Sequence, residues 1–418
     1  MQIEVVTIGD ELLLGFTIDT NAAHLARELA SRGVAIVRRT TCGDSASEIA
    51  SAVRDALDRS GAVITTGGLG PTSDDLTKES IAAIFGRAMR LDEEIVDNLK
   101  ARWKARGWPG ELPKANYQQA MIPEGCDILV NNHGSAPGIW LEDDRGRWVA
   151  MLPGVPREMR GMLADALLPR IEQRLTGTPL VIRSRTLRTS GIAESALADL
   201  LGPLAKAPFG LSLAYLPGVA GVDLRLTARN LSAGDADALL AQGAEALRAQ
   251  VGHAIYGEGN DDLAAIVLSE MRARGLTLAL AESCTGGLLG QRITAVPGSS
   301  DVLLGGVVAY ANEVKVSHLD VRPETLAAHG AVSEATAGEM ALGAQKRFKT
   351  SAALSVTGVA GPGGGTPEKP VGMVCFGVAL GDSLKTFSAN LYGDRPEIRE
   401  RAAQAALNAL RRALTKGL

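Results

Sequence analysis

Residues 1–170 alternate short apolar runs with amphipathic stretches, and this alternation constrains the fold more than any other feature. Apolar runs at 3–8, 35–37 and 62–66 are separated by helical spacing at 21–32 and 45–59. A strand–helix order of this kind favours a parallel sheet that helices cover on both faces. In such sheets ligands bind at the carboxyl ends of the strands, so the turns that follow the strands are the first places to search.

The pattern changes twice further along the chain. Turn-forming residues at 176–179 and 256–261 bracket a stretch with the order strand, helix, two strands and long helix, which is an α+β pattern. After the second of these linkers, strands and helices alternate again, up to an alanine-rich helix at 397–414. We therefore predict three domains, at residues 1–175, 176–257 and 258–418.

Composition excludes several classes of protein. The net charge of -4 gives no reason to expect nucleic acid or an anionic membrane as partner. No run of about 18 apolar residues suggests a membrane span, and the beginning, MQIEVVTIGDELL, has no basic region of the signal-peptide type. The four cysteines, Cys42, Cys126, Cys284 and Cys375, form no C-x-x-C pair, which argues against a zinc cluster and favours a reduced, cytoplasmic setting.

Polar, glycine-rich turns follow two of the N-terminal strands, at 9–11 and 66–75. Such turns can cradle phosphates, and neighbouring carboxylates can hold a hard divalent cation. The phosphate-binding candidates are Gly67, Gly68, Gly70 and Thr72. The metal-binding or catalytic candidates are Asp10, Glu11, Asp74 and Asp75. The alternative for Asp74 and Asp75 is that they only compensate the dipole of the following helix.

Four polar clusters mark the C-terminal part, at 281–287, 296–301, 310–315 and 356–372. The first runs from a strand into Ser-Cys-Thr-Gly-Gly and a helix, which suits an anion, although a simple capped helix start is the alternative. The last is rich in glycine, which fits close approach to a ligand or, alternatively, a flexible loop.

Lys315 stands just after a buried strand, within the third cluster. Desolvation there would lower its pKa and let it act as a base towards a nearby serine. Ser300 lies fifteen positions earlier, so the two side chains meet only if the chain folds back on itself. The alternative is a surface turn and a solvated lysine.

Six motifs follow one another over residues 260–418: AESCTGG, PGSSD, YANEVK, HGAVSE, VTGVAGPGGGTPEKPVG and GDRPEIR. In this order they resemble the C-terminal domain of the CinA family of competence/damage-inducible proteins and the stand-alone nicotinamide mononucleotide amidohydrolases (PncC). Gly363 departs from the pattern, since an acidic or other polar residue is expected there. The resemblance implies an α/β domain that deamidates nicotinamide mononucleotide without a cofactor.

Carried over by position, the resemblance makes Ser300 the nucleophile, Lys315 its base and Tyr310 an assisting group. It also implies a set of substrate-binding residues: Ser283, Thr285, Gly286, Gly287, Ser299, Thr357, Arg395 and Arg399. The roles of Ser299 and Ser300 could be exchanged, as could those of the two arginines.

The motifs of residues 1–170 resemble the molybdopterin-binding fold, a three-layer α/β domain, in the variant found in CinA proteins. The implied activity is a pyrophosphatase acting on ADP-ribose with a divalent metal, with potassium as a further candidate ion. The middle part resembles the small α+β KH-like connector of the same proteins. It lacks a GxxG loop with basic flanks, so we predict no RNA binding and expect a spacer or a homodimer contact. The alternatives are a pterin-binding protein and a non-enzymatic partner in competence.

Overall fold

The computed structural model describes residues 1–177, 180–206 and 208–416. The first predicted linker, at 176–179, therefore lies partly outside the described residues. The chain divides into two compact units: residues 1–183 with 228–237, and residues 184–227 with 238–418. None of the helices in the described part of the chain is long and apolar enough to cross a membrane.

The first unit is built on a six-stranded sheet with the order β2-β1-β3-β8-β7-β6. Its first four strands pair in parallel, as the strand–helix alternation predicted, whereas the last two pair antiparallel. The strands are β1 (Gln2–Ile8), β2 (Ala35–Cys42), β3 (Ala62–Thr66), β6 (Asp127–Leu129), β7 (Gly138–Glu142) and β8 (Trp148–Leu152). A separate antiparallel pair is formed by β4 (Met89–Leu91) and β5 (Met121–Pro123).

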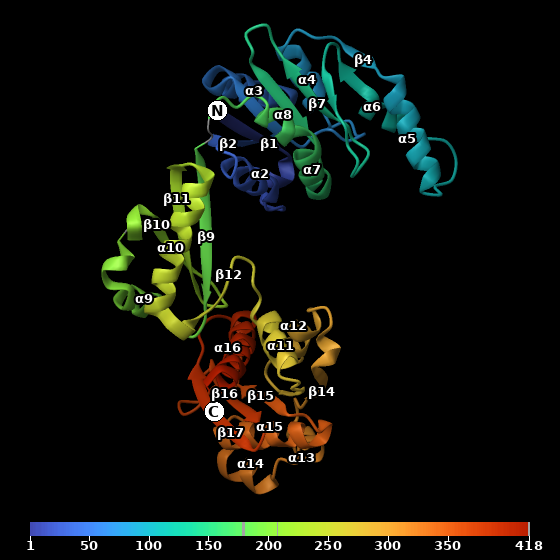
Figure 1. Cartoon of the computed structure of the whole chain (residues 1–418). Helices are drawn as coiled ribbons and strands as arrows, with labels where there is room; N and C mark the ends of the chain where they lie inside the picture. The colour runs from blue at the N-terminus through green and yellow to red at the C-terminus, as the bar shows by residue number, and fades with distance from the viewer. Residues whose placement is uncertain (178–179, 207, 417–418) are drawn as a thin grey trace. The chain divides into compact units, whose positions relative to one another are not determined.

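Helices cover both faces of this sheet, which gives three layers. Alternate residues of β1 pack into different cores: Ile3 and Val5 join one cluster, Val6 and Ile8 the other. This alternation follows from the twofold period of a strand. One face carries α3 (Ala46–Ser60), α4 (Thr77–Ile84) and α5 (Glu93–Ala105), and the other carries α2 (Thr20–Ala30), α7 (Pro156–Met162) and α8 (Leu168–Glu172). Figure 1 labels β1, β2 and β7 of this sheet among helices α2, α3, α4, α7 and α8. Two one-turn helices complete the unit, α1 (Asp10–Leu13) and α6 (Tyr117–Ala120).

Local sequence signals explain where these helices begin and end. The side chain of Ser45 accepts a hydrogen bond from the Glu48 N–H and so caps α3, and Asp19 caps α2 in the same way. At its other end α3 stops at Gly61, whose φ of 70° lies in the left-handed region that favours glycine.

The middle part of the chain forms a four-stranded sheet with the order β10-β11-β9-β12, accompanied by two helices. The strands are β9 (Val181–Thr189), β10 (Ser212–Pro217), β11 (Val222–Leu231) and β12 (Ile255–Glu258), and the helices are α9 (Glu194–Leu201) and α10 (Ala233–Val251). This is the α+β order that the sequence predicted.

The C-terminal part has a five-stranded sheet with the order β14-β13-β15-β16-β17. The first three strands are parallel and the last two antiparallel, a change of direction that the sequence analysis did not predict. The strands are β13 (Leu278–Glu282), β14 (Leu303–Val308), β15 (Ala352–Gly358), β16 (Met373–Leu380) and β17 (Ser383–Asn390).

Helices lie on both faces of this sheet as well. The larger core joins α11 (Leu263–Ala273), α12 (Leu288–Thr294) and α16 (Arg395–Lys416) to one face. The opposite face packs against α13 (Asn312–Leu319) and α15 (Glu334–Phe348), with α14 (Pro323–His329) beside them. Small alanines on the strands, among them Ala279, Ala281 and Ala353, let α15 approach this face closely.

Candidate functional site

The carboxyl ends of β13 and β14 lie side by side, because the two strands are parallel neighbours with Glu282 opposite Val308. Ser283 follows β13 directly, and its N–H donates a 2.8 Å hydrogen bond to the Val356 carbonyl of β15. Beyond β14 the chain turns into α13, which carries Lys315. The topology therefore brings Ser283 and Lys315 to the same edge of the sheet.

A hydrogen bond joins these two side chains. Lys315 Nζ lies 3.1 Å from Ser283 Oγ, and it also donates to the carbonyl oxygens of Ala309 at 2.7 Å and Tyr310 at 3.3 Å. The two carbonyls hold the amine in place. Because a neutral amine can donate two protons and accept one, this geometry also suits an uncharged lysine that receives the serine proton.

The environment of Lys315 favours its neutral form. Its side chain is 1% exposed, and it has no carboxylate within ion-pair distance in the described chain. Burial lowers the pKa of Lys315 below its ordinary value, with smaller opposing effects from Cys284 and Glu313. Ser283 is 9% exposed, so its hydroxyl is the more accessible member of the pair.

The thiol beside the serine is not a competing nucleophile. Burial raises the pKa of Cys284 to about 12, and its side chain packs into the larger core of the domain. Since the thiolate is the reactive form of cysteine, this shift disfavours reaction of Cys284 at neutral pH.

Two arginines from the first turns of α16 reach the same edge. Arg395 donates to the Tyr310 hydroxyl at 2.8 Å and to the Gly361 carbonyl, and Arg399 donates to the Thr285 carbonyl at 2.7 Å. Neither arginine forms an ion pair with a carboxylate in the described residues, so both can still interact with an anion. The structure thus gathers Ser283, Lys315, Tyr310 and both arginines.

The predicted pair of Ser300 and Lys315 is not assembled. Ser299 and Ser300 form a 3-10 turn, Ser299–Asp301, that precedes β14, whereas Lys315 follows this strand. A six-residue strand is about 20 Å long, so both serines lie at the opposite end of the sheet from the lysine. The serine within reach of Lys315 is Ser283, which the sequence analysis had assigned to substrate binding.

The predicted anion cradle at 285–287 is also occupied by the protein itself. The carboxylate of Glu282 accepts hydrogen bonds from the N–H groups of Gly287, Leu289 and Gly290 at 2.8–3.0 Å. It therefore caps α12, and neither a serine nor a threonine does. These N–H groups are not available to a phosphate.

Two threonines predicted to line the site differ in their bonding. Thr357 donates its hydroxyl hydrogen bond to the Ala331 carbonyl at 2.8 Å, so its side chain is committed to the fold. The Thr285 hydroxyl is fully buried and has no hydrogen-bond partner among the described residues.

The first unit has a cavity of 510 Å³ at the carboxyl ends of its parallel strands. The predicted residues Glu11, Gly67, Gly68, Gly70, Asp74 and Asp75 line it. Asp10 and Thr72 do not belong to this lining. Residues that the sequence analysis did not single out contribute as well, among them Asn21, Asp44 and Gln119.

Several hydrogen-bond donors of the glycine-rich loop at this cavity already bond to acceptors within the protein. Asp75 accepts from the N–H of Gly70 at 2.6 Å and from both the N–H and the hydroxyl of Thr72 at 2.8 and 2.5 Å. The Gly67 N–H donates to the Leu152 carbonyl. Its φ is 115°, and a Cβ there would lie 2.1 Å from the Ile8 carbonyl oxygen, so glycine is required for packing.

The carboxylates of this cavity lie near one another without forming a ready metal site. The backbone N–H of Asp10 donates to the Asp44 carboxylate at 2.9 Å, and that of Asp44 to the Asp10 carboxylate at 3.3 Å. Burial raises the pKa of Asp44, and the nearby carboxylates add to this effect. In the described part of the chain, no three His, Cys, Asp or Glu side chains gather as metal ligands. The metal requirement stays a prediction.

One sequence signal could have indicated which serine lies beside Lys315. In a parallel sheet, functional groups collect after strands and not before them. Ser283 and Lys315 each follow a strand, whereas Ser300 precedes one. The role of Glu282 carried no comparable signal, because a carboxylate at the end of a strand can point in many directions.

Three families together match nearly the whole chain. Residues 4–173 match the family described as "Probable molybdopterin binding domain", residues 184–257 the "Damage-inducible protein CinA KH domain", and residues 260–414 the "CinA C-terminal domain". These matches agree with the predicted fold classes of the N-terminal, middle and C-terminal parts.

Full-length relatives give the same result. A CinA-like protein of Gemmatimonas aurantiaca is 64% identical over 416 residues, covering 100% of this chain and 97% of the relative. A CinA-like protein of Frankia casuarinae is 44% identical over 420 residues, covering 99% of this chain and 96% of the relative. The crystal structure of the competence/damage inducible protein CihA from Agrobacterium tumefaciens is 41% identical, with a TM-score of 0.36, and covers 37% of this chain and 94% of that one. The chain therefore belongs to the CinA family of competence/damage-inducible proteins and carries a molybdopterin-binding-like domain, a KH domain and a CinA C-terminal domain.

Proposed function

We propose that the C-terminal domain hydrolyses the carboxamide of nicotinamide mononucleotide to nicotinate mononucleotide and ammonia. The observation that carries this proposal is the 3.1 Å contact between the hydroxyl of Ser283 and the buried amine of Lys315. Serine and lysine in this arrangement form a nucleophile and its base without a metal ion. The choice of substrate rests on the resemblance to the nicotinamide mononucleotide amidohydrolases.

In the proposed reaction, neutral Lys315 takes the proton of the Ser283 hydroxyl while Oγ attacks the carboxamide carbon. The tetrahedral intermediate collapses as Lys315 returns the proton to the amide nitrogen, which leaves as ammonia. Water, deprotonated by the same lysine, then attacks the acyl-enzyme ester and releases the carboxylate product. Lys315 alternates between its neutral and its protonated form, and each step leaves it in the form that the next step requires.

Other groups at this edge have supporting roles in the proposal. The backbone N–H groups of Cys284 and Thr285 donate to no backbone carbonyl in the described chain, but both lie beside the buried Cys284 thiol. Arg395, which holds the exposed Tyr310 hydroxyl, and Arg399 supply positive charge for the substrate phosphate. The buried Thr285 hydroxyl, which lacks a partner, can bond to the ribose.

The test is to incubate the full chain with nicotinamide mononucleotide and to measure ammonia and nicotinate mononucleotide, with and without a chelator. We expect equal amounts of both products, unaffected by the chelator, and a loss of about 10³-fold or more in Ser283→Ala. A wild-type chain that releases no ammonia would overturn the proposal, and tight binding of a pterin instead would favour the alternative function.

A second proposal concerns the first unit: hydrolysis of the pyrophosphate of ADP-ribose. It is favoured by the 510 Å³ cavity, whose lining includes Glu11, Asp44 and Asp74 together with Gly68, a residue whose N–H donates to no backbone carbonyl among the described residues. A divalent metal would supply charge neutralisation there, and these carboxylates are the ligands the chain offers. We expect metal-dependent release of AMP and ribose phosphate that Glu11→Gln and Asp74→Asn reduce, with Ser283→Ala as the control that leaves it unchanged.

A further inference from the structure

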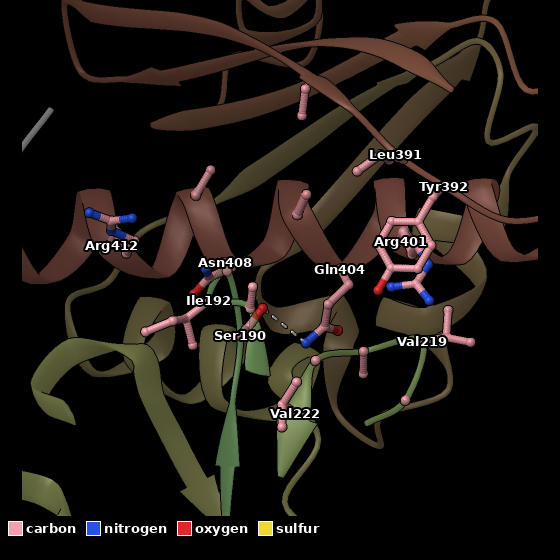
Figure 2. A pocket seen from close by; sticks show the side chains of 18 of the residues that line it. Ser190, Ile192, Val219, Val222, Leu391, Tyr392, Arg401, Gln404, Asn408 and Arg412 are labelled. Atoms are coloured by element: carbon pink, nitrogen blue, oxygen red, sulfur yellow. Dashed lines mark hydrogen bonds between the residues drawn. The ribbon is translucent and has the colours of Figure 1, made fainter. Parts of the chain in front are cut away.

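The second unit encloses a cavity of 660 Å³ that the proposed amidase reaction does not use (Figure 2). Helix α16 and the end of β17 form one side of it, and segments 190–194 and 217–222 of the KH domain form the other. Its volume lies in the range typical of sites for small organic ligands.

Buried carboxamides point into this space from the middle of α16. Gln404 is 3% exposed, and its amide nitrogen lies 3.5 Å from the Ser190 hydroxyl (Figure 2). Its carbonyl oxygen is buried and accepts no resolved hydrogen bond among the described residues, while the same side chain also approaches the Tyr256 hydroxyl. One turn further, the carbonyl of Asn408 accepts from Arg411, while no described residue accepts from its amide nitrogen. A buried acceptor without a donor is costly, so a ligand with an N–H or O–H group would be stabilised here.

The charged groups of the cavity are mostly positive and unpaired. Lys385, Arg401 and Arg412 line it, and none has a carboxylate within ion-pair distance in the described chain. One carboxylate, that of Glu194, lies at the same cavity. The excess of positive charge favours an anionic ligand.

The remaining surface suits a flat apolar group. Ile192, Val219 and Leu391 contribute aliphatic side chains, and the ring of Tyr392 is 72% exposed beside them. The guanidinium of Arg401 lies 3.9 Å from the centre of this ring (Figure 2). An aromatic base can stack on such a surface while its phosphate meets the cations.

From these features we infer that the cavity is a second binding site, for a nucleoside monophosphate. This class combines an aromatic base, hydroxyl donors for the unpaired Gln404 oxygen and a phosphate for the cations. The cavity shares no lining residue with the group around Ser283, since the first turns of α16 serve that group and later turns serve the cavity. The inference does not depend on the proposed amidase activity.

The experiment measures backbone hydrogen exchange of the full chain against AMP concentration, with Ser283→Ala as background to exclude turnover. We expect AMP to protect residues 190–194 and 217–222. Arg412→Ala and Gln404→Leu should each raise the concentration for half-maximal protection by about tenfold. Arg347→Ala, an exposed arginine on α15 away from the cavity, is the matched control and should not change it.

Arg412 is exposed, so its loss does not endanger folding even if the buried Gln404→Leu change does. Adenosine and inorganic phosphate, tested separately, should each protect the two segments more weakly than AMP. Absence of protection at millimolar AMP, or equal midpoints for Arg412→Ala and Arg347→Ala, would overturn the inference. Full protection by phosphate alone would also contradict it, because the base would then have no role.

Discussion

The two units each contain a fully buried lysine, and the comparison shows which contacts distinguish them. Lys78 of α4 and Lys315 of α13 are both 1% exposed, and burial lowers the pKa of each. Lys78 donates to the carbonyls of Gln118 and Gln119 and to no hydroxyl in the described chain. Lys315 likewise donates to two carbonyls, those of Ala309 and Tyr310, and it also contacts the hydroxyl of Ser283. A desolvated amine becomes a base only when a nucleophile is within its reach.

Replacing each lysine by methionine gives the largest expected difference. Lys315→Met keeps the volume of the side chain but removes the base, so release of ammonia from nicotinamide mononucleotide should fall by roughly 10³-fold or more. Lys78→Met should leave that rate within about threefold. Steady-state kinetics of both variants measure these rates. Similar losses of ammonia release in Lys315→Met and Lys78→Met would contradict the proposed difference between the two lysines.

The stability of the first unit should depend on Lys78 in a pH-dependent way. Burial lowers the pKa of Lys78 from 10.5 to about 8. Between these values the unfolded chain binds the proton and the folded chain does not, so the free energy of unfolding should rise with pH, by at most about 3 kcal/mol. The penalty is fully present below pH 8.

Tryptophan fluorescence reports on the stability of the first unit alone, because all four tryptophans lie between residues 103 and 148, in that unit. Denaturation followed by tryptophan fluorescence at pH 8 and pH 10 should show a larger gain for the wild type than for Lys78→Met. Lys104→Met, at an exposed lysine, is the control and should behave like the wild type. If the free energy of unfolding changed equally with pH in all three proteins, Lys78 would not be the cause of the pH dependence.

The pH profile of the proposed amidase activity tests the other lysine, Lys315. If neutral Lys315 is the base, kcat/KM should rise about tenfold per pH unit on the acid side and level off as pH passes its folded pKa. Because burial lowers that pKa, the plateau should begin below pH 10.5, the ordinary value for lysine. A profile that rises only above pH 10.5, or that falls as pH rises from 6 to 9.5, would contradict this assignment.

The smallest effect is expected at the neighbouring thiol. Burial raises the pKa of Cys284 to about 12, so iodoacetamide at neutral pH should not inactivate the enzyme. Cys284→Ala should change the rate of ammonia release by less than about threefold. Rapid inactivation with alkylation at this position would show that the site is more open than the structure indicates.

The order of strands and helices was predictable from periodicity, since buried strands such as β1 and β3 are short apolar runs and α3 carries its own cap and stop signals. The antiparallel direction of the strands at the edges of both sheets was not predictable, because the direction of a strand depends on the length and path of the connection that precedes it. The polar turns singled out in the sequence do lie at the carboxyl ends of strands in the first unit and in the C-terminal part.

The partners within these edges were harder to predict. Glu282 takes the N–H groups of α12 and Asp75 takes those of the glycine-rich loop, and both choices depend on which side chain reaches the donors first. Which acceptor binds these N–H groups depends on local geometry over a few ångströms, and the spacing of residues in the sequence does not specify that geometry. The expectation that Ser300 meets Lys315 was wrong for a simpler reason, since it disregarded the direction of β14.

The most direct test of the central claim compares two serine variants in one assay. Ser283→Ala and Ser300→Ala both remove one hydroxyl, but only the first removes a group bonded to Lys315. With nicotinamide mononucleotide as substrate, we predict that Ser283→Ala loses ammonia release almost completely while Ser300→Ala retains the wild-type rate. Loss of activity in Ser300→Ala with Ser283→Ala unaffected would contradict the account.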